Sequence, residues 1–263
     1  MSDVPPPPPP PPAEPPPPPA AGPPPSGSPD VGGAISWAFA AFGKNVGPML
    51  GLAAVIVVAG LIGRLIQTAL EPIFNRTLNN CQNITNDAEL QACLNSGGGG
   101  FFGAVFGGLA LQIIVFVITL IATIGLINAS LKVTRGEKAS FGDIWHPRHF
   151  WLYLFVSIVA GLGIGVGLVA CIIPGLVLLW LWQFVQYAAL DEGKGFGHAF
   201  STGMRAVTRN KGLAIVTLLV VFVANLITVF TCGIGALVVM PFVCLFMANM
   251  YRQFLGQSVA PAN

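Results

Sequence analysis

Six long stretches of apolar residues dominate the chain after its first 30 residues. Each stretch is close to the 20 or so residues with which an α-helix crosses a hydrocarbon core of roughly 30 Å. We therefore predict an all-α integral membrane protein with six transmembrane helices. The predicted spans cover residues 46–70, 103–131, 150–173, 176–190, 213–231 and 236–255.

Short turn-forming sequences predict how these spans are connected. Pro174 and Gly175 separate the third span from the fourth, and residues 232–235 separate the fifth from the sixth. Such tight connections join antiparallel helices, so we expect three helical hairpins. The polar stretch 71–100 between the first two spans is predicted to be the outer loop of the first hairpin.

Each hairpin is expected to follow a short amphipathic helix that lies in the inner membrane interface. Apolar side chains recur on one helical face in the first and last of these segments, and basic residues follow the last one. The third copy, residues 140–148, is weaker. The predicted apolar stripes are Ile35, Phe39 and Phe42 in the first segment and Phe196, Phe200 and Met204 in the last.

The first and last amphipathic segments also resemble each other in sequence. They share six identities in sixteen positions at a constant separation of 165 residues. We interpret this match as an internal repeat. The alternative is convergence, because Gly, Ser and Asn cap helices and form turns wherever a helix begins. The identical pairs are Gly32/Gly197, Ala34/Ala199, Ser36/Ser201, Ala41/Ala206, Asn45/Asn210 and Gly47/Gly212.

The positions of Lys and Arg predict the orientation of the chain. If the N-terminus lies inside, ten of the twelve basic residues fall on the inner side. Arg76 alone is then outside, and Arg64 lies within a span. Cytoplasmic loops carry such an excess of positive charge. We expect a multi-pass plasma-membrane protein with both termini in the cytoplasm, including a short C-terminal segment at 256–263.

Composition narrows the classes of function. Charged residues make up only 8% of the 263 residues, and hydrophobic residues make up 54%. Soluble domains carry about 25% charged residues. A soluble enzyme and a nucleic-acid-binding protein are therefore excluded, and the lipid bilayer is the first expected partner.

Residues 1–30 form a separate proline-rich tail. This stretch holds 17 of the 23 prolines, and proline supports neither helix nor sheet interiors. We predict a disordered, extended polyproline II arm and no signal peptide, because a basic and then apolar leader is missing. The arm is either a spacer or, through residues 5–25, a ligand for the aromatic groove of a protein partner.

The five cysteines suggest one structural disulfide. Cys81 and Cys93 lie in the predicted outer loop, where the surroundings are oxidising, and we expect them to pair. Cys171 and Cys232 lie at the outer ends of two spans, where they either pair or, as we prefer, pack as buried apolar residues. Cys244 lies within a span and is expected to pack there.

Polar groups at membrane depth are few. Arg64 is the one charged residue inside a span, and Gln67 and Glu71 follow it on the same helical face. Arg64 either snorkels outward and pairs with Glu71 or contacts a substrate or lipid headgroup in a cavity. The other strongly polar residues in the spans, which we interpret as interhelical contacts, are Gln112, Gln183, Gln186 and Asn225.

No motif for catalysis, cofactor binding or metal binding is present, so we predict no catalytic residues, no cofactor and no enzymatic activity. The histidines near Asp143 flank Pro147, and this geometry is poor for a metal. We interpret this region as an interfacial anchor. The predicted interface anchors are Trp37, Trp145, Trp151, Arg205, Arg209 and Lys211.

Several short motifs resemble a known group of proteins. Residues 136–145, 190–195, 199–201, 209–210 and 250–252 resemble the polytopic domain of uncharacterised bacterial integral membrane proteins. That group is related to the membrane domain fused to some glycerophosphodiester phosphodiesterases. The tail and the Ala-, Gly- and Val-rich spans resemble proline- and glycine-rich transmembrane proteins of actinobacteria such as mycobacteria. This resemblance covers roughly residues 31–255 and implies six spans and a bacterial plasma membrane, but no defined activity.

We therefore predict a non-enzymatic scaffold or accessory subunit. Its proline-rich tail or its spans would engage partner proteins. The alternative is a transporter or lipid-handling protein with a cavity between the spans, reached by Arg64 or by the glutamines of the spans. The glycines of the third span, Gly161, Gly163, Gly165 and Gly167, permit close helix approach in the first interpretation and mark a flexible segment in the second.

Overall fold

The computed structural model describes residues 28–80, 86–144, 149–231 and 233–262. All regular structure within these ranges is helical, so the predicted all-α class is confirmed. The elements are α1 (Val31–Lys44), α2 (Val46–Asn80), α3 (Asp87–Thr134), the 3-10 helix η1 (Phe141–Ile144), α4 (Phe150–Ala170), α5 (Ile172–Leu181), α6 (Val185–Glu192), α7 (Phe196–Arg209), α8 (Lys211–Phe230) and α9 (Ala236–Phe254).

Six helical segments of the described chain are long and apolar enough to cross a membrane. Their ends differ from those of the predicted stretches by no more than four residues. Length and hydropathy alone therefore locate every span, because a helix in lipid must be continuous and apolar over the thickness of the bilayer. The segments are Val46–Pro72, Phe106–Thr134, Phe150–Ala170, Ile172–Glu192, Lys211–Phe230 and Ala236–Phe254.

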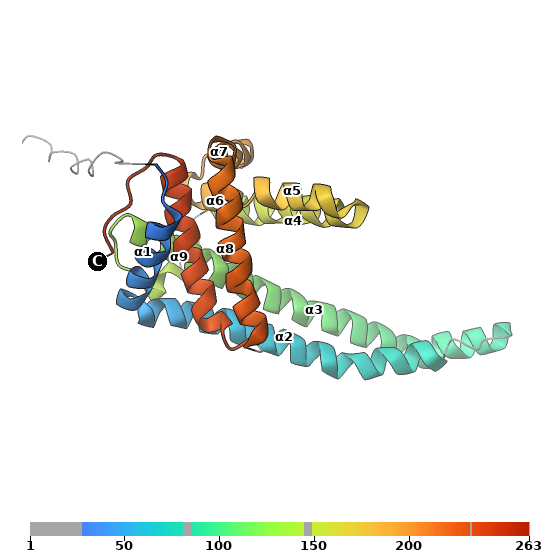
Figure 1. Cartoon of the computed structure of the whole chain (residues 1–263). Coiled ribbons are helices and arrows are strands. Elements are labelled where there is room, and N and C mark those ends of the chain that lie inside the picture. The colour runs from blue at the N-terminus through green and yellow to red at the C-terminus, as the bar shows by residue number, and fades with distance from the viewer. Residues whose placement is uncertain (1–27, 81–85, 145–148, 232, 263) are drawn as a thin grey trace, which may run out of the picture.

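The helices pair into three hairpins that meet at one end of the molecule (Figure 1). The hairpins are α2–α3, α4–α5 and α8–α9. Their shared end, which we call the packed end, consists of α1, the last four turns of α3, α6, α7 and α9. Its largest fully buried side chains include Ile124 of α3, Phe184 beside α6, Val207 of α7 and Tyr251 of α9.

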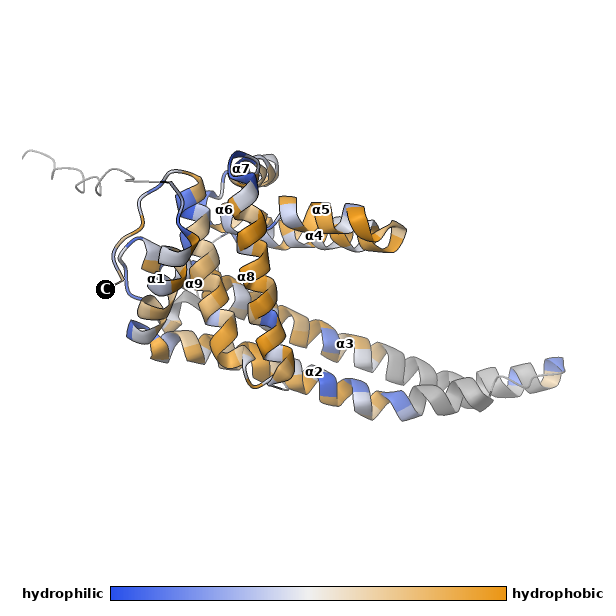
Figure 2. Ribbon diagram, viewed as in Figure 1, coloured by the Kyte–Doolittle hydropathy of each residue, from blue (hydrophilic) through white to orange (hydrophobic). Residues whose placement is uncertain are grey.

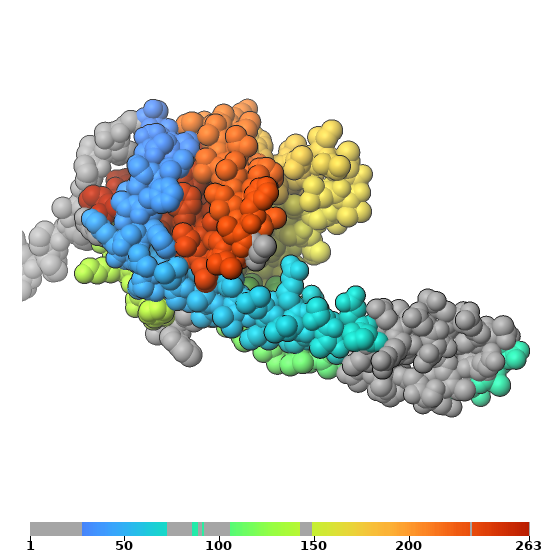
Figure 3. All heavy atoms as spheres, turned by 60° about the horizontal axis from the view of Figure 1, so that its bottom comes forward, coloured from blue at the N-terminus to red at the C-terminus, as the bar shows by residue number. Residues whose placement is uncertain are grey.

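The α2–α3 and α4–α5 hairpins project away from the packed end and are apolar along most of their described length (Figure 2). In the space-filling view the α4–α5 hairpin stands clear of the α2–α3 hairpin (Figure 3). Side chains such as Leu162, Val166 and Val169 of α4 are exposed in the isolated chain. In a membrane these side chains face lipid or other membrane proteins.

The predicted outer loop at 71–100 is largely helical. α2 continues to Asn80 and α3 begins at Asp87, so the two helices extend beyond their apolar spans. Once two antiparallel helices are paired, adding a turn costs little nucleation free energy, and the polar residues of this stretch are compatible with helix. The change from apolar to polar residues near position 71 therefore marks the end of the first span, but α2 itself continues beyond it.

The turn between the third and fourth spans lies three residues earlier than predicted. α4 ends at Ala170, and Cys171 is extended, with φ −167° and ψ 137°. Pro174 lies in the first turn of α5, where a missing N–H costs nothing. Gly175 is needed for close approach, because a Cβ built on it would lie 2.6 Å from the backbone nitrogen of Leu168.

The fourth span is broken near its middle. α5 ends at Leu181 and α6 begins at Val185, with a turn over Trp182–Phe184. Gln183 stabilises this break, because its Nε2 donates to the carbonyl oxygen of Trp180 at 3.0 Å and to that of Ala214 in α8 at 3.3 Å. Side-chain donors of this kind satisfy backbone carbonyls that an interrupted helix leaves free.

Two of the three predicted amphipathic segments are helices. α1 and α7 each have 14 residues, and each leads directly into a span. The third segment was predicted as a helix over 140–148, but its described part forms only the single 3-10 turn η1. Residues 145–148 lie outside the described ranges, and Pro147 among them disfavours a regular helix.

The predicted apolar stripes of α1 and α7 are only partly buried, and they flank the faces that pack most closely. Phe39 is 59% exposed and Phe196 is 42% exposed. The buried faces consist mainly of small residues, which allow helix backbones to approach closely, as in membrane interiors. These residues are Ala34, Ala38 and Ala41 in α1 and Ala199, Thr202, Gly203, Ala206 and Val207 in α7.

Candidate functional site

Two asparagines connect the amphipathic helices to the rest of the packed end. Asn45, between α1 and α2, donates through Nδ2 to the carbonyl oxygen of Ala41 at 3.0 Å and accepts from the backbone N–H of Ala139 at 3.2 Å. Asn210, between α7 and α8, donates to the carbonyl oxygens of Ala206 at 3.1 Å and Phe254 at 3.3 Å. Both side chains therefore bind the carbonyl four residues earlier and also hold a distant segment.

The C-terminal segment crosses the packed end as an extended strap. The Ala260 N–H donates to the carbonyl oxygen of Thr134 at 2.9 Å and so caps α3. The indole Nε1 of Trp37 donates to the carbonyl oxygen of Ala260 at 2.8 Å, and Lys44 Nζ donates to that of Ala262 at 2.7 Å. Trp37, predicted as an interface anchor, is thus half-buried and fixes the chain terminus.

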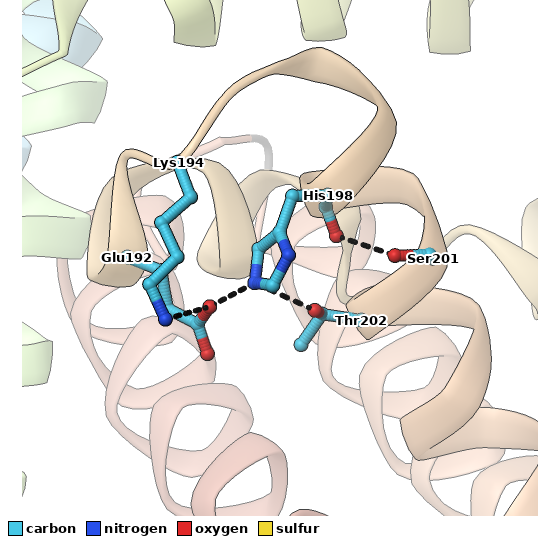
Figure 4. Close-up of polar contacts among 5 residues, drawn as sticks. All are labelled: Glu192, Lys194, His198, Ser201 and Thr202. Carbon is cyan, nitrogen blue, oxygen red and sulfur yellow. Dashed lines mark hydrogen bonds and ion pairs between the residues drawn. The ribbon is translucent and has the colours of Figure 1, made fainter.

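A cluster of charged and polar side chains lies where α6 turns into α7 (Figure 4). The ring Nε2 of His198 is hydrogen-bonded to the carboxylate of Glu192, and Lys194 Nζ lies 3.4 Å from the same carboxylate oxygen. The hydroxyl oxygen of Thr202 lies 3.3 Å from the same ring nitrogen. Ser201 donates to the backbone carbonyl of His198 at 3.0 Å.

This cluster contains the residue types of a catalytic triad but not its geometry. A triad needs the carboxylate on one ring nitrogen and the hydroxyl on the other, so that the imidazole can relay a proton. Here Glu192 and Thr202 both contact Nε2 of His198. Thr202 is also buried, so a substrate cannot reach its hydroxyl. The arrangement joins α6 to α7 across Gly193 and Gly195, both of which have positive φ.

A second ion pair joins α3 to α6. The guanidinium of Arg135 contacts the carboxylate of Asp191, whose side chain is nearly buried. In the last turn of α9, Arg252 Nε donates to Gln257 Oε1 at 3.2 Å, which holds the start of the C-terminal strap. From the sequence, the basic residues among these predict only the orientation of the chain in the membrane. Their pairing depends on contacts between distant helices, which no local pattern predicts.

A groove of about 460 Å³ opens between α3, α4 and α6 at the base of the α4–α5 hairpin. Its walls are mostly apolar, and it lies within the membrane-spanning segments. Its polar centre is the hydrogen bond from Gln186 Nε2 to Ser157 Oγ at 3.4 Å. The lining residues are Phe116, Thr119, Leu120, Thr123, Tyr153, Leu154, Ser157, Ile158, Gly161, Leu162 and Gln186.

The polar residues predicted for the first hairpin lie on its exposed surface, and their role stays a prediction. Arg64, Gln67 and Glu71 of α2 are all exposed, and within the described ranges Arg64 makes no ion pair or side-chain hydrogen bond with Glu71. Arg64 and Glu71 are seven residues apart, which is about two helical turns. Side chains pair along a helix when they are three or four residues apart, so lying on a common face does not bring these two charges together. Arg64 also lies away from the groove, which Gln186 reaches instead.

The other predicted anchors have different surroundings. Trp151 is 69% exposed at the start of α4, and its ring packs edge-on against Phe150. Arg205, Arg209 and Lys211 are exposed where α7 meets α8. Trp145 lies outside the described residues. The membrane-anchoring role of these side chains stays a prediction.

The cysteine predictions fall largely on undescribed positions. Cys81 and Cys232 lie outside the described residues, and the side chain of Cys93 is not described, so the Cys81–Cys93 disulfide stays a prediction. Cys171 is an exposed free thiol in the turn between α4 and α5, rather than a buried apolar residue. Cys244 is a partly buried free thiol in α9. In the part of the chain that the structure describes, no group of three or more His, Cys, Asp or Glu residues could hold a metal ion.

These features define a multi-pass, all-α membrane protein. The chain is 27% identical over 238 residues to the uncharacterized protein Rv2560 of Mycobacterium tuberculosis, a match that covers 88% of this chain and 70% of that protein. The uncharacterized protein Mb2590 of Mycobacterium bovis matches with the same identity and coverage. No protein-family model and no solved structure matches. The expected likeness to mycobacterial proteins is thus confirmed, whereas the likeness to glycerophosphodiester phosphodiesterases finds no support.

Proposed function

We propose that this chain is a non-enzymatic scaffold or accessory protein of the plasma membrane, with both termini in the cytoplasm. The orientation is supported by the sorting of ten of the twelve basic residues to one side. In this orientation the packed end faces the cytoplasm. The proline-rich tail then extends from the same side and is available to a cytoplasmic partner.

The observation that carries the proposal is the two-sided glycine pattern of α4. Gly163 and Gly167 face α5, because Cβ atoms built on them would lie 2.5 Å from the Trp182 ring and 2.9 Å from Gly175. Gly161 and Gly165 face open space instead. Paired small residues four apart permit close packing of membrane helices. One side of α4 is thus used within the chain, and the other is free for a helix of a partner protein.

The test is the set of proteins that co-purify with the full-length chain from gently solubilised membranes. Gly165→Leu places a bulky side chain on the free face without touching α5. Val166→Leu, at a neighbouring exposed position, is the matched control. Deletion of residues 1–30 tests recruitment by the tail separately. We expect loss of membrane partners with Gly165→Leu and loss of cytoplasmic partners with the deletion.

A partner list that neither the glycine substitution nor the tail deletion changes would contradict the scaffold proposal. Loss of the same partners in the Val166→Leu control would also contradict it, because the effect would then not depend on the small-residue face. Normal abundance and an unchanged thermal unfolding midpoint must accompany each result, so that misfolding does not imitate loss of binding.

The groove between α3, α4 and α6 favours a second candidate, a lipid-handling protein. Its apolar walls and its position within the spans suit a hydrocarbon chain, and the Gln186–Ser157 pair supplies one polar contact. Thr119→Phe fills the groove from α3 and is separate from the Gly165 test position, which does not line the groove. Lipid handling predicts that this variant loses a co-purifying lipid and keeps its protein partners, whereas the scaffold proposal predicts no change in either.

A further inference from the structure

Helix α7 lies at the membrane surface, because both of its ends are tied to spans. It follows Glu192, the last residue of one membrane-spanning segment, and precedes Lys211, the first residue of the next. Its small-residue face is pressed against α6, and a Cβ built on Gly203 would lie 2.8 Å from the Cα of Val185. The remaining faces of α7 are therefore the ones that meet the bilayer and water.

One flank of α7 is apolar and only partly covered. Phe196, which is 42% exposed, packs on Phe200 with ring centroids 4.7 Å apart. Phe200 in turn meets Trp182 edge-on at 5.3 Å. Partly exposed aromatic rings on a surface helix are typical of segments that insert into the boundary between headgroups and acyl chains.

The C-terminal end of the same helix carries three uncompensated positive charges. Arg205, Arg209 and Lys211 are exposed, and none of their side chains makes a hydrogen bond or ion pair within the described ranges. The hydropathy view shows this hydrophilic end of α7 where it meets α8 (Figure 2). Arg205 and Arg209 are four residues apart and so lie on one face of the helix.

Three other basic side chains at the packed end do have partners. Arg135 pairs with Asp191, and Lys194 lies against Glu192. Lys44 donates to the backbone carbonyl of Ala262. Arg205, Arg209 and Lys211 thus have no partner in the described chain, whereas Arg135 and Lys194 are each paired with a carboxylate.

We propose that the α7–α8 corner, formed by Arg205, Arg209 and Lys211, binds the headgroup of an anionic phospholipid. The phosphate accepts hydrogen bonds from the two guanidinium groups and the ammonium. Phe196 and Phe200 lie half a turn away on the opposite flank of α7 and hold the helix in the interface rather than contact this headgroup. A basic residue at an anionic membrane surface contributes about 1 kcal/mol, so three of them predict about a 100-fold difference in affinity.

The experiment titrates the full-length, detergent-solubilised protein with phosphatidylglycerol or with zwitterionic phosphatidylcholine and counts bound lipid by native mass spectrometry. The test variant combines Arg205→Gln, Arg209→Gln and Lys211→Gln. The control variant combines Lys44→Gln, Lys138→Gln and Lys194→Gln, which removes the same net charge from the same end of the protein.

We expect the wild type and the control to bind phosphatidylglycerol much more tightly than phosphatidylcholine, and the test variant to lose about 100-fold in affinity for phosphatidylglycerol. Binding by the wild type should weaken as salt rises, and binding by the test variant should not. Soluble glycerol 3-phosphate should not displace the lipid, because it lacks the acyl chain.

Equal affinity of the test variant and the wild type for phosphatidylglycerol would overturn the proposal, as would an equal loss in the control. Displacement by glycerol 3-phosphate would assign the corner to a soluble phosphate ligand instead and would also overturn it. The three substituted side chains are exposed and make no described contacts, so the lipid-free unfolding midpoint of the test variant should match that of the wild type.

Discussion

The packed end and the α4–α5 hairpin have opposite surroundings, and the α4 span, which is the more apolar of the two spans compared, is the less buried. More than half of the α9 span (56%) is buried within the protein, compared with 17% of the α4 span. α9 is covered by α1, α2, α3 and α8, whereas α4 packs mainly on α5 and meets other helices only near its base. Hydropathy alone does not rank the spans by burial, because the span in α3 is more apolar than the span in α4 and yet is 39% buried.

What distinguishes the two regions is side-chain hydrogen bonding across helices. At the packed end, Asn45, Asn210 and Trp37 each bind a backbone group of a distant segment. Along the outer half of the α4–α5 hairpin, beyond Ser157 and Gln183, the described contacts are van der Waals contacts at glycines. The packed end fixes the protein in one arrangement, and the hairpin leaves an apolar surface for lipid or partners.

The largest effect should come from Gly203→Leu at the packed end. A Cβ at this position would lie within 2.9 Å of backbone atoms of Val185, so α7 must separate from α6. Overpacking against backbone predicts a loss of about 3 kcal/mol in stability. Thermal unfolding in detergent measures the loss. Gly197→Leu, on the open side of the same helix, is the control and should change little.

Asn45→Ala should have the next largest effect. The substitution leaves the buried N–H of Ala139 without its partner and removes the bond to the Ala41 carbonyl. An unsatisfied buried donor costs about 1–3 kcal/mol. Asn210→Ala should cost less, because Asn210 is less buried and its lost acceptor partners are carbonyl groups. Equal unfolding midpoints for the two variants would contradict this ranking.

Gly163→Ala should weaken the hairpin without unfolding the packed end. The added methyl meets the ring of Trp182, so α4 and α5 must shift apart, at a cost of about 1 kcal/mol. Hydrogen exchange should therefore rise within α4 and α5 and stay unchanged in α9. In Gly165→Ala the methyl enters open space, and exchange in the hairpin should match that of the wild type.

The smallest effect should come from Trp37→Phe. This substitution keeps the aromatic ring and removes one partly buried hydrogen bond, from Nε1 to the Ala260 carbonyl, for a loss of about 0.5 kcal/mol. The C-terminal strap should become more sensitive to carboxypeptidase. Trp151→Phe removes an exposed indole and should leave the strap protected. Equal digestion of the two variants would show that Trp37 does not hold the strap.

The polar sites show where sequence reasoning reached its limit. The positions of the spans, α1 and α7 followed from local hydropathy and turn residues. The groove did not, because it is formed by α3, α4 and α6, which are brought together only by folding. The Glu192–His198 pair was also missed, although the two residues are six apart, because the tight turn through Gly193 and Gly195 is needed to bring them together.

In the amphipathic helices α1 and α7, the sequence pattern likewise did not predict which face packs most closely against the protein. Large apolar residues predict the buried side of a helix in a soluble protein, where water is the alternative. In a membrane the alternative is lipid, so Phe39, which packs on one side against Phe242, and Phe196 can remain largely exposed. Close packing then selects Ala and Gly for the protein side, and α1 and α7 both show this choice.

The sequence by itself determined the class of this protein, the six spans and the sorting of charge, because transfer into lipid depends on the length and hydropathy of single helices. The tertiary structure decided which spans form the core, which charges are neutralised and where the groove opens. Those features depend on contacts between residues that are up to 223 positions apart, such as Trp37 and Ala260. Such contacts arise from the packing of whole helices, which no local pattern encodes.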